Sequence, residues 1–135
     1  MSDSTDVVAG TNATATQYNN LRKDLVLGQG ISGTETDGST VTFDMSDKTK
    51  GNEREVTLGG NRTLAFSNVA TRQRFIIHLI QDGTGGRTVT WPSGIKWPFG
   101  VVPTLSTGAN KIDSFGFICT GSGAYRGYVL GQQLA

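Results

Sequence analysis

The sequence has few of the residues from which most catalytic and metal sites are built. It contains one histidine, His78, and one cysteine, Cys119, whereas a zinc site uses several such ligands. The single cysteine also excludes an intrachain disulfide. His78 lies in an apolar stretch, so we expect it to be packed and hydrogen-bonded rather than catalytic. The eleven carboxylates are scattered, and we predict no metal, no cofactor and no enzyme activity.

The chain also lacks an excess of charge and a long apolar run. Its formal net charge is +1, which gives no long-range field to steer it onto nucleic acid or anionic lipid. The longest apolar run, residues 75–80, is far too short to span a bilayer. The first ten residues, MSDSTDVVAG, do not resemble a signal peptide. We therefore expect a soluble protein made in a cytoplasm, with neither nucleic acid nor membrane as a partner.

What is present is glycine, with 19 residues, and short segments that alternate apolar and polar residues. Such segments separated by glycine turns are typical of β-sandwiches and barrels. The segment at 74–81 is apolar on both faces and predicts a central strand, or one covered on both sides. We predict an all-β fold, a β-sandwich of the jelly-roll type, with strands in 40–45, 54–60, 62–67, 74–81, 87–91, 112–120 and 124–131.

Ahead of the β-rich part, residues 15–27 have the pattern of one short α-helix. Thr14 can cap its start, and Tyr18, Leu21 and Leu25 fall on one stripe. One short stripe is marginal alone, so the helix must dock on something. The stripe is a candidate assembly interface, and it packs either on its own β-domain or on a neighbouring subunit.

These patterns divide the chain into three parts. We predict an N-terminal arm and helix in residues 1–27, a linker in 28–39 and the β-sandwich domain in 40–135. The linker is polar and rich in glycine, and its length permits either placement of the helix.

Both tryptophans lie in one stretch, RTVTWPSGIKWPFG, at residues 87–100. Trp91 and Trp97 each precede a proline in a turn pattern, which predicts a corner of the β-fold where the two rings pack. The alternative is that they stack on a sugar or a partner side chain, as exposed aromatic residues often do. Trp91, Trp97, Tyr125 and Tyr128 are therefore candidates for surface recognition.

Longer segments resemble a known class of protein. VTLGGNRTLAFSN followed by RFIIHLIQDGTGGRTVTWPSGIKWPFGVVPTLSTGANKIDSFGFICTGSGAYRGY resembles a module of tailed-bacteriophage virion proteins, over residues 55–128. DVVAGTNATATQYNNLRKDLV, residues 6–26, resembles the start of phage tail and appendage proteins. The resemblance implies a structural role in the virion, no catalytic residue, and assembly of identical copies as a homotrimer.

Within that class, the short chain suggests a head decoration (cement) protein that binds the capsid surface and stabilises the particle. Its partners would be its own copies and the major capsid protein. The alternative is a tail-fibre, spike or baseplate appendage that contacts tail proteins and takes part in host attachment, with a host surface glycan as ligand. Either location is in the virion, after synthesis in the bacterial host cytoplasm.

Overall fold

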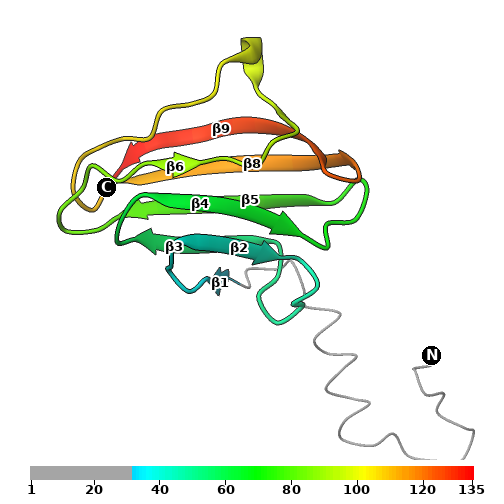
Figure 1. Cartoon of the computed structure of the whole chain (residues 1–135), viewed down its shortest axis with the longest axis horizontal. Helices are drawn as coiled ribbons and strands as arrows, with labels where there is room; N and C mark the ends of the chain where they lie inside the picture. Colours follow the sequence, from blue (N-terminus) through cyan, green and yellow to red (C-terminus); the bar gives the residue numbers. More distant parts are fainter. Residues whose placement is uncertain (1–31) are drawn as a thin grey trace, which may run out of the picture.

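The computed structural model describes residues 32–135, which form two β-sheets and one short 3-10 turn (Figure 1). The helix predicted at 15–27, with Tyr18, Leu21 and Leu25, lies outside the described residues. A six-stranded sheet has the order β1-β3-β5-β8-β9-β7, and a three-stranded sheet has the order β2-β4-β6. The elements are β1 (Ser32–Thr34), β2 (Thr40–Asp44), β3 (Glu53–Leu58), β4 (Arg62–Ser67), β5 (Arg74–Gln81), β6 (Val89–Thr90), β7 (Ile95–Lys96), η1 (Pro98–Gly100), β8 (Ile112–Gly121) and β9 (Ala124–Leu134).

The first six strands alternate between the two sheets. The chain therefore winds around the core, and each strand pairs in parallel with the strand two places earlier in the sequence. Parallel neighbours in a sheet need a crossover, and here a strand of the other sheet is that crossover. The antiparallel hairpin β8–β9 then extends the larger sheet beside β5.

The prediction of an almost entirely β fold is confirmed for residues 32–135, but its finer parts are not. A jelly roll is built from antiparallel Greek keys, whereas β2, β4 and β6 pair only in parallel. The alternation of apolar and polar residues within a strand shows which face is buried, but it does not show which strand lies beside it. A chain that winds between two sheets and a jelly roll therefore have the same sequence pattern. The structure also places β1 inside the segment that we expected to be a linker.

The core lies between the two sheets and is built from the strand faces that the sequence pattern predicts. Its side chains of at most 1 % exposure come from both sheets: Val41, Phe43, Val56, Leu58, Leu64, Ile77, Phe115, Phe117 and Cys119. Phe66 of β4 contacts Phe75, Phe117 and Tyr125 of the larger sheet edge-on, at centroid distances of 5.1 to 5.2 Å. These aromatic contacts join the two layers.

One face of the six-stranded sheet packs on the core, and the opposite face carries no further layer of the described residues. β5 is central in its sheet, as predicted, yet its outward-facing Ile76 is 36 % exposed. Within residues 32–135, no helix is long and apolar enough to cross a membrane.

Candidate interaction surface

Exposed apolar side chains of the described residues gather near strand β9. The large ones that are at least 36 % exposed lie on a loop that starts beside β9, on β9 itself, or on β5, which β8 separates from β9: Phe99, Val101, Val102, Tyr128, Val129, Leu130, Leu134 and Ile76. Single exposed apolar residues are ordinary, but a contiguous group usually marks an interaction site.

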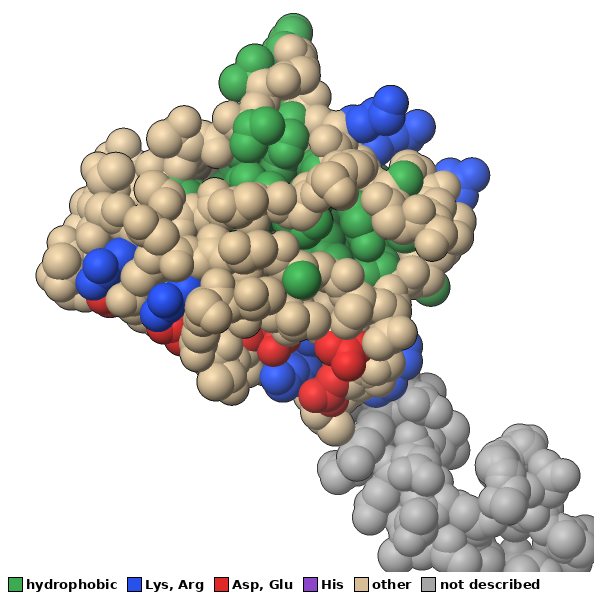
Figure 2. Space-filling model, viewed as in Figure 1, with side chains coloured by type: hydrophobic (Ala, Val, Ile, Leu, Met, Phe, Trp, Pro, Cys, Tyr) green, Lys and Arg blue, Asp and Glu red, His purple; other side chains and the backbone are tan. Residues whose placement is uncertain are grey.

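The loop of residues 98–104, the projecting loop, stands out from the body of the molecule (Figure 1). Phe99 is 102 % exposed, so its side chain is not packed on any other residue of the described part of the chain. Phe99 also has φ +58°, a left-handed conformation that is strained for a bulky residue. Figure 2 shows apolar side chains at the end of this projection and in the area beneath it.

Both ends of the projecting loop are fixed in the core. Trp97 and Leu105, which flank it, are 7 % and 9 % exposed. The Trp97 ring lies against β9 at Gly127, where an added Cβ would come within 2.7 Å of Trp97 Cζ3. At the other end, Asp113 Oδ2 accepts a hydrogen bond from Ser106 N at 2.7 Å. The loop is thus an exposed apolar tip on a firmly held base.

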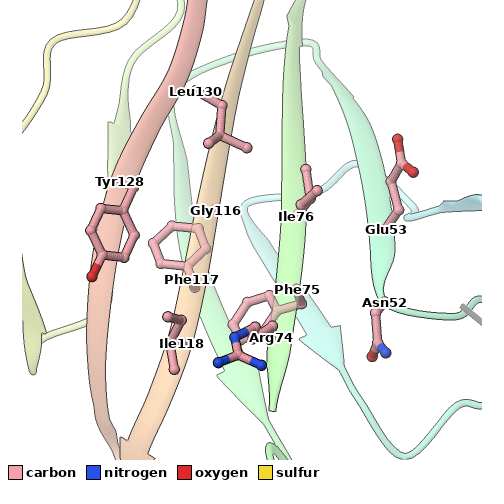
Figure 3. A pocket seen from close by; sticks show the side chains of 10 residues that line it. All are labelled: Asn52, Glu53, Arg74, Phe75, Ile76, Gly116, Phe117, Ile118, Tyr128 and Leu130. Carbon is pink, nitrogen blue, oxygen red and sulfur yellow. The ribbon is translucent and has the colours of Figure 1, made fainter. Parts of the chain in front are cut away.

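The second feature is a groove on the outer face of the six-stranded sheet, with a volume of about 340 Å³ (Figure 3). Its lining residues come from the turn before β3, the first residue of β3, and β5, β8 and β9: Asn52, Glu53, Arg74, Phe75, Ile76, Gly116, Phe117, Ile118, Tyr128 and Leu130. Ile76, Gly116 and Tyr128 are successive neighbours across three strands. Because Gly116 has no side chain, the surface is hollow between its two larger neighbours. We call this the apolar groove.

The third feature is the outer edge of β9. β7 pairs with it only at Tyr125 and Arg126, so among the described residues no strand covers the edge beyond that point. Near the C-terminal end, the Gln132 side chain donates to Thr104 O at 2.8 Å and so ties the strand to the projecting loop. An uncovered, apolar strand edge can pair with another chain.

The same sheet face carries a chain of hydrogen bonds centred on His78. Its Nδ1 lies 2.6 Å from Ser114 Oγ, and its Nε2 lies 2.7 Å from Glu53 Oε2. Serine, histidine and carboxylate in this order are the components of a hydrolase triad. However, Ser114 is 5 % exposed and lies within β8, which is paired on both sides. A hydrolase needs an accessible nucleophile and hydrogen-bond donors aimed at an oxyanion, and the buried Ser114 does not have the accessibility of such a nucleophile.

Two aspartates outside this surface hold loops in place and have low pKa values. The Arg87 side chain, followed by the backbone N–H of Gly85, lowers the pKa of Asp82 to about 2. Hydrogen bonds from the Asn68 and Ser46 side chains lower the pKa of Asp44 to about 2. Among the described residues, no group of three or more His, Cys, Asp or Glu side chains could hold a metal ion.

The structure separates the four aromatic residues that the sequence suggested for surface recognition. Trp97 and Tyr125 are buried, and Trp91 is half-buried against Trp97 with a centroid distance of 5.1 Å. The two tryptophans thus pack at a corner of the fold, and Trp97 and Tyr125 do not have the surface position expected of recognition residues. Only Tyr128 is exposed, at 41 %, and it lines the apolar groove.

Sequence reasoning missed Phe99 and the groove. Phe99 could have been noticed because it lies between proline and glycine in WPFG, outside any alternating pattern. The groove could not, because its lining depends on the order of β3, β5, β8 and β9 in the sheet.

Together, these features define a two-sheet β-domain with an apolar edge, a projecting loop and a groove. Residues 45–124 match a family described as "Putative phage tail fibre C-terminal domain", and the chain belongs to this family. It is therefore a structural protein of tailed-phage virions, of the tail-fibre type. The match supports the tail-fibre alternative better than head decoration. Searches of curated proteins and of solved structures found no match.

Proposed function

We propose that the chain is a non-catalytic component of a phage tail fibre, spike or baseplate appendage that takes part in host attachment. The observation that carries this proposal is the family match over residues 45–124. The surface supports it, because the exposed apolar groups suit protein contacts within an appendage.

Head decoration is the competing location, and imaging separates the two. Virions are labelled with gold-conjugated antibody fragments raised against the purified chain and viewed by electron microscopy. Gold on the tail or baseplate supports the proposal, whereas gold spread over the head contradicts it and supports decoration. Labelling of a head-only preparation in parallel measures non-specific binding to capsids.

A role in attachment is tested by competition. Purified chain added to host cells before infection should slow phage adsorption if its surface contacts the receptor directly. If the adsorption rate is unchanged although the gold label lies on the tail, the chain is an internal part of the appendage. That result would contradict the attachment role.

The proposed lack of catalysis is tested at Ser114. The purified chain should not hydrolyse chromogenic esters above the background rate. Turnover that disappears in Ser114→Ala, while the variant keeps the wild-type circular dichroism spectrum, would show that the Ser114–His78–Glu53 chain is an active site.

A further inference from the structure

We propose that the projecting loop of one copy docks in the apolar groove of a second copy, with Phe99 seated between Ile76, Tyr128 and Leu130. The inference concerns how copies of the chain associate. It does not depend on where in the virion the chain is located, so it can fail while the proposed function stands.

The first support is the distribution of exposed apolar surface. Every large hydrophobic side chain that is at least 36 % exposed in residues 32–135 lies on the projecting loop, on β9, or on β5 beside the groove. Ile76, Tyr128 and Leu130 lie on the outer face, whereas Val129, paired with the core residue Phe115, faces the other side of the sheet. A partner that covers the groove and the β9 edge would therefore cover most of this group, and the rest of the described surface offers no comparable one.

The second support is the conformation of Phe99. A bulky side chain at φ +58° is strained, and an exposed phenyl ring gains nothing from burial to offset that strain. Hydrogen bonds from Gly100 N to Trp97 O and from Val101 N to Pro98 O hold the turn in this shape. The turn thus presents an aromatic ring without the cost of ordering a flexible loop on binding.

The third support is the match between loop and groove. The groove, at about 340 Å³, has room for a phenyl ring with part of the flanking backbone. The loop sequence PFGVVPT carries no charge, and the groove contains one Arg and one Glu, whose charges balance. Arg74 can donate to carbonyl oxygens of an incoming turn, and its neighbours supply apolar contact.

The occupant is a second copy and not the loop's own chain. The loop projects away from the body (Figure 1), and Trp97 and Leu105 fix its two ends in the core. Burying a phenylalanine removes about 150–250 Å² from water, against about 800 Å² per partner in a standard interface. The rest must come from the uncovered β9 edge, which lies between loop and groove in the same sheet region. Such a contact is head-to-tail and closes into a ring when the rotation permits.

The experiment measures the mass of the full chain by sedimentation equilibrium over a range of concentrations. Wild type should associate, and Phe99→Asn should weaken association at least about 30-fold, as expected for a hot-spot residue. Asparagine tolerates positive φ, so this variant should keep the wild-type fold and melting temperature or exceed it. Thr90→Asn, an exposed position in the smaller sheet, is the matched control and should associate like wild type.

A mixing experiment tests the head-to-tail arrangement. Leu130 is 56 % exposed, and Leu130→Lys places a charge in the groove, so this variant should also associate more weakly than wild type. The Leu130→Lys variant keeps an intact loop, and the Phe99→Asn variant keeps an intact groove. A mixture of the two should therefore form heterodimers that a short cross-linker traps.

Several results would overturn the proposal. These are a wild-type chain that is monomeric at every concentration, a Phe99→Asn variant that keeps wild-type association, or a mixture without heterodimers. Dissociation by Leu21→Glu but not by Phe99→Asn would assign the contact to the N-terminal segment instead.

Discussion

Among residues 32–135, Arg54 is the one basic side chain that is buried almost completely, at 1 % exposure. Its Nη1 donates to Glu35 at 2.7 Å, and its other nitrogens donate to the carbonyl oxygens of Gly51, Asp44 and Asp47. A buried charge is tolerated only when it is paired and hydrogen-bonded in this way. Arg54 therefore fastens the loop between β2 and β3 to the end of β1.

Replacing this side chain tests that role. Arg54→Met leaves Glu35 without its main partner and three carbonyl oxygens without a donor, so we expect a loss of about 3–5 kcal/mol in the free energy of unfolding. Urea denaturation measures it. Lys48→Met removes an exposed positive charge from the same loop and should change stability by less than about 0.5 kcal/mol. Equal losses in the two variants would contradict the role of burial.

Gly127 makes a second test at the scale of one residue. An alanine there would place Cβ 2.7 Å from Trp97 Cζ3 and 2.8 Å from Ile95 Cγ2. We expect Gly127→Ala to displace the indole ring, lower stability by about 1–3 kcal/mol and change the tryptophan emission spectrum. Gly83→Ala meets nothing within 4 Å and should leave both unchanged. An unaltered spectrum in Gly127→Ala would show that Trp97 does not pack on β9.

At the scale of the element, the sequence predicted strands better than it predicted their neighbours. The alternation of Val41 and Phe43, and of Phe115 and Phe117, correctly identified buried faces, because side chains alternate along any strand. Pairing partners could not be predicted, since winding between two sheets and folding into hairpins bury the same faces. The apolar residues on both faces of β5, Ile76 among them, suggested a strand covered on both sides. The open groove could not be predicted from them, because it depends on which strands lie beside β5.

The loop after β5 gives a prediction for pH. Asp82 has a folded pKa of about 2, below its ordinary value of 3.8, because Arg87 and Gly85 donate to it. Its contribution to stability is therefore complete above about pH 4 and is lost as the pH falls from about 4 to 2. The free energy of unfolding, measured by urea titration at several pH values, should fall over this range.

The variant Asp82→Asn isolates that contribution. It should be less stable than wild type at pH 7, and its stability should decline less steeply between pH 4 and 2, because one linked group has been removed. Gly83→Ala keeps the carboxylate and should show the wild-type slope. An Asp82→Asn slope as steep as that of wild type would assign the acid sensitivity to other groups.

At the scale of the whole molecule, the wound strands and the β8–β9 hairpin have different roles. The winding arranges β1 to β6 in two sheets, and the hairpin completes the core with Phe115 and Phe117 and extends the larger sheet beside β5. The hairpin carries the uncovered strand edge, the attachment of the projecting loop and one side of the groove, and β3 and β5 supply the other side of the groove. The proposed assembly contacts therefore combine the hairpin with the outer face of the wound strands.

Hydrogen–deuterium exchange tests the proposed contact between copies most directly. It is measured on the full chain at one concentration at which the copies are dissociated and at one at which they are associated. Backbone amides in 97–104 and 127–134 should become protected on association, because the loop enters a groove and the β9 edge is covered. Amides of β2 and β4 should exchange at the same rate at both concentrations. Protection that appears in β2 and β4, or in residues 1–31, and not at the loop and β9 would contradict the central claim.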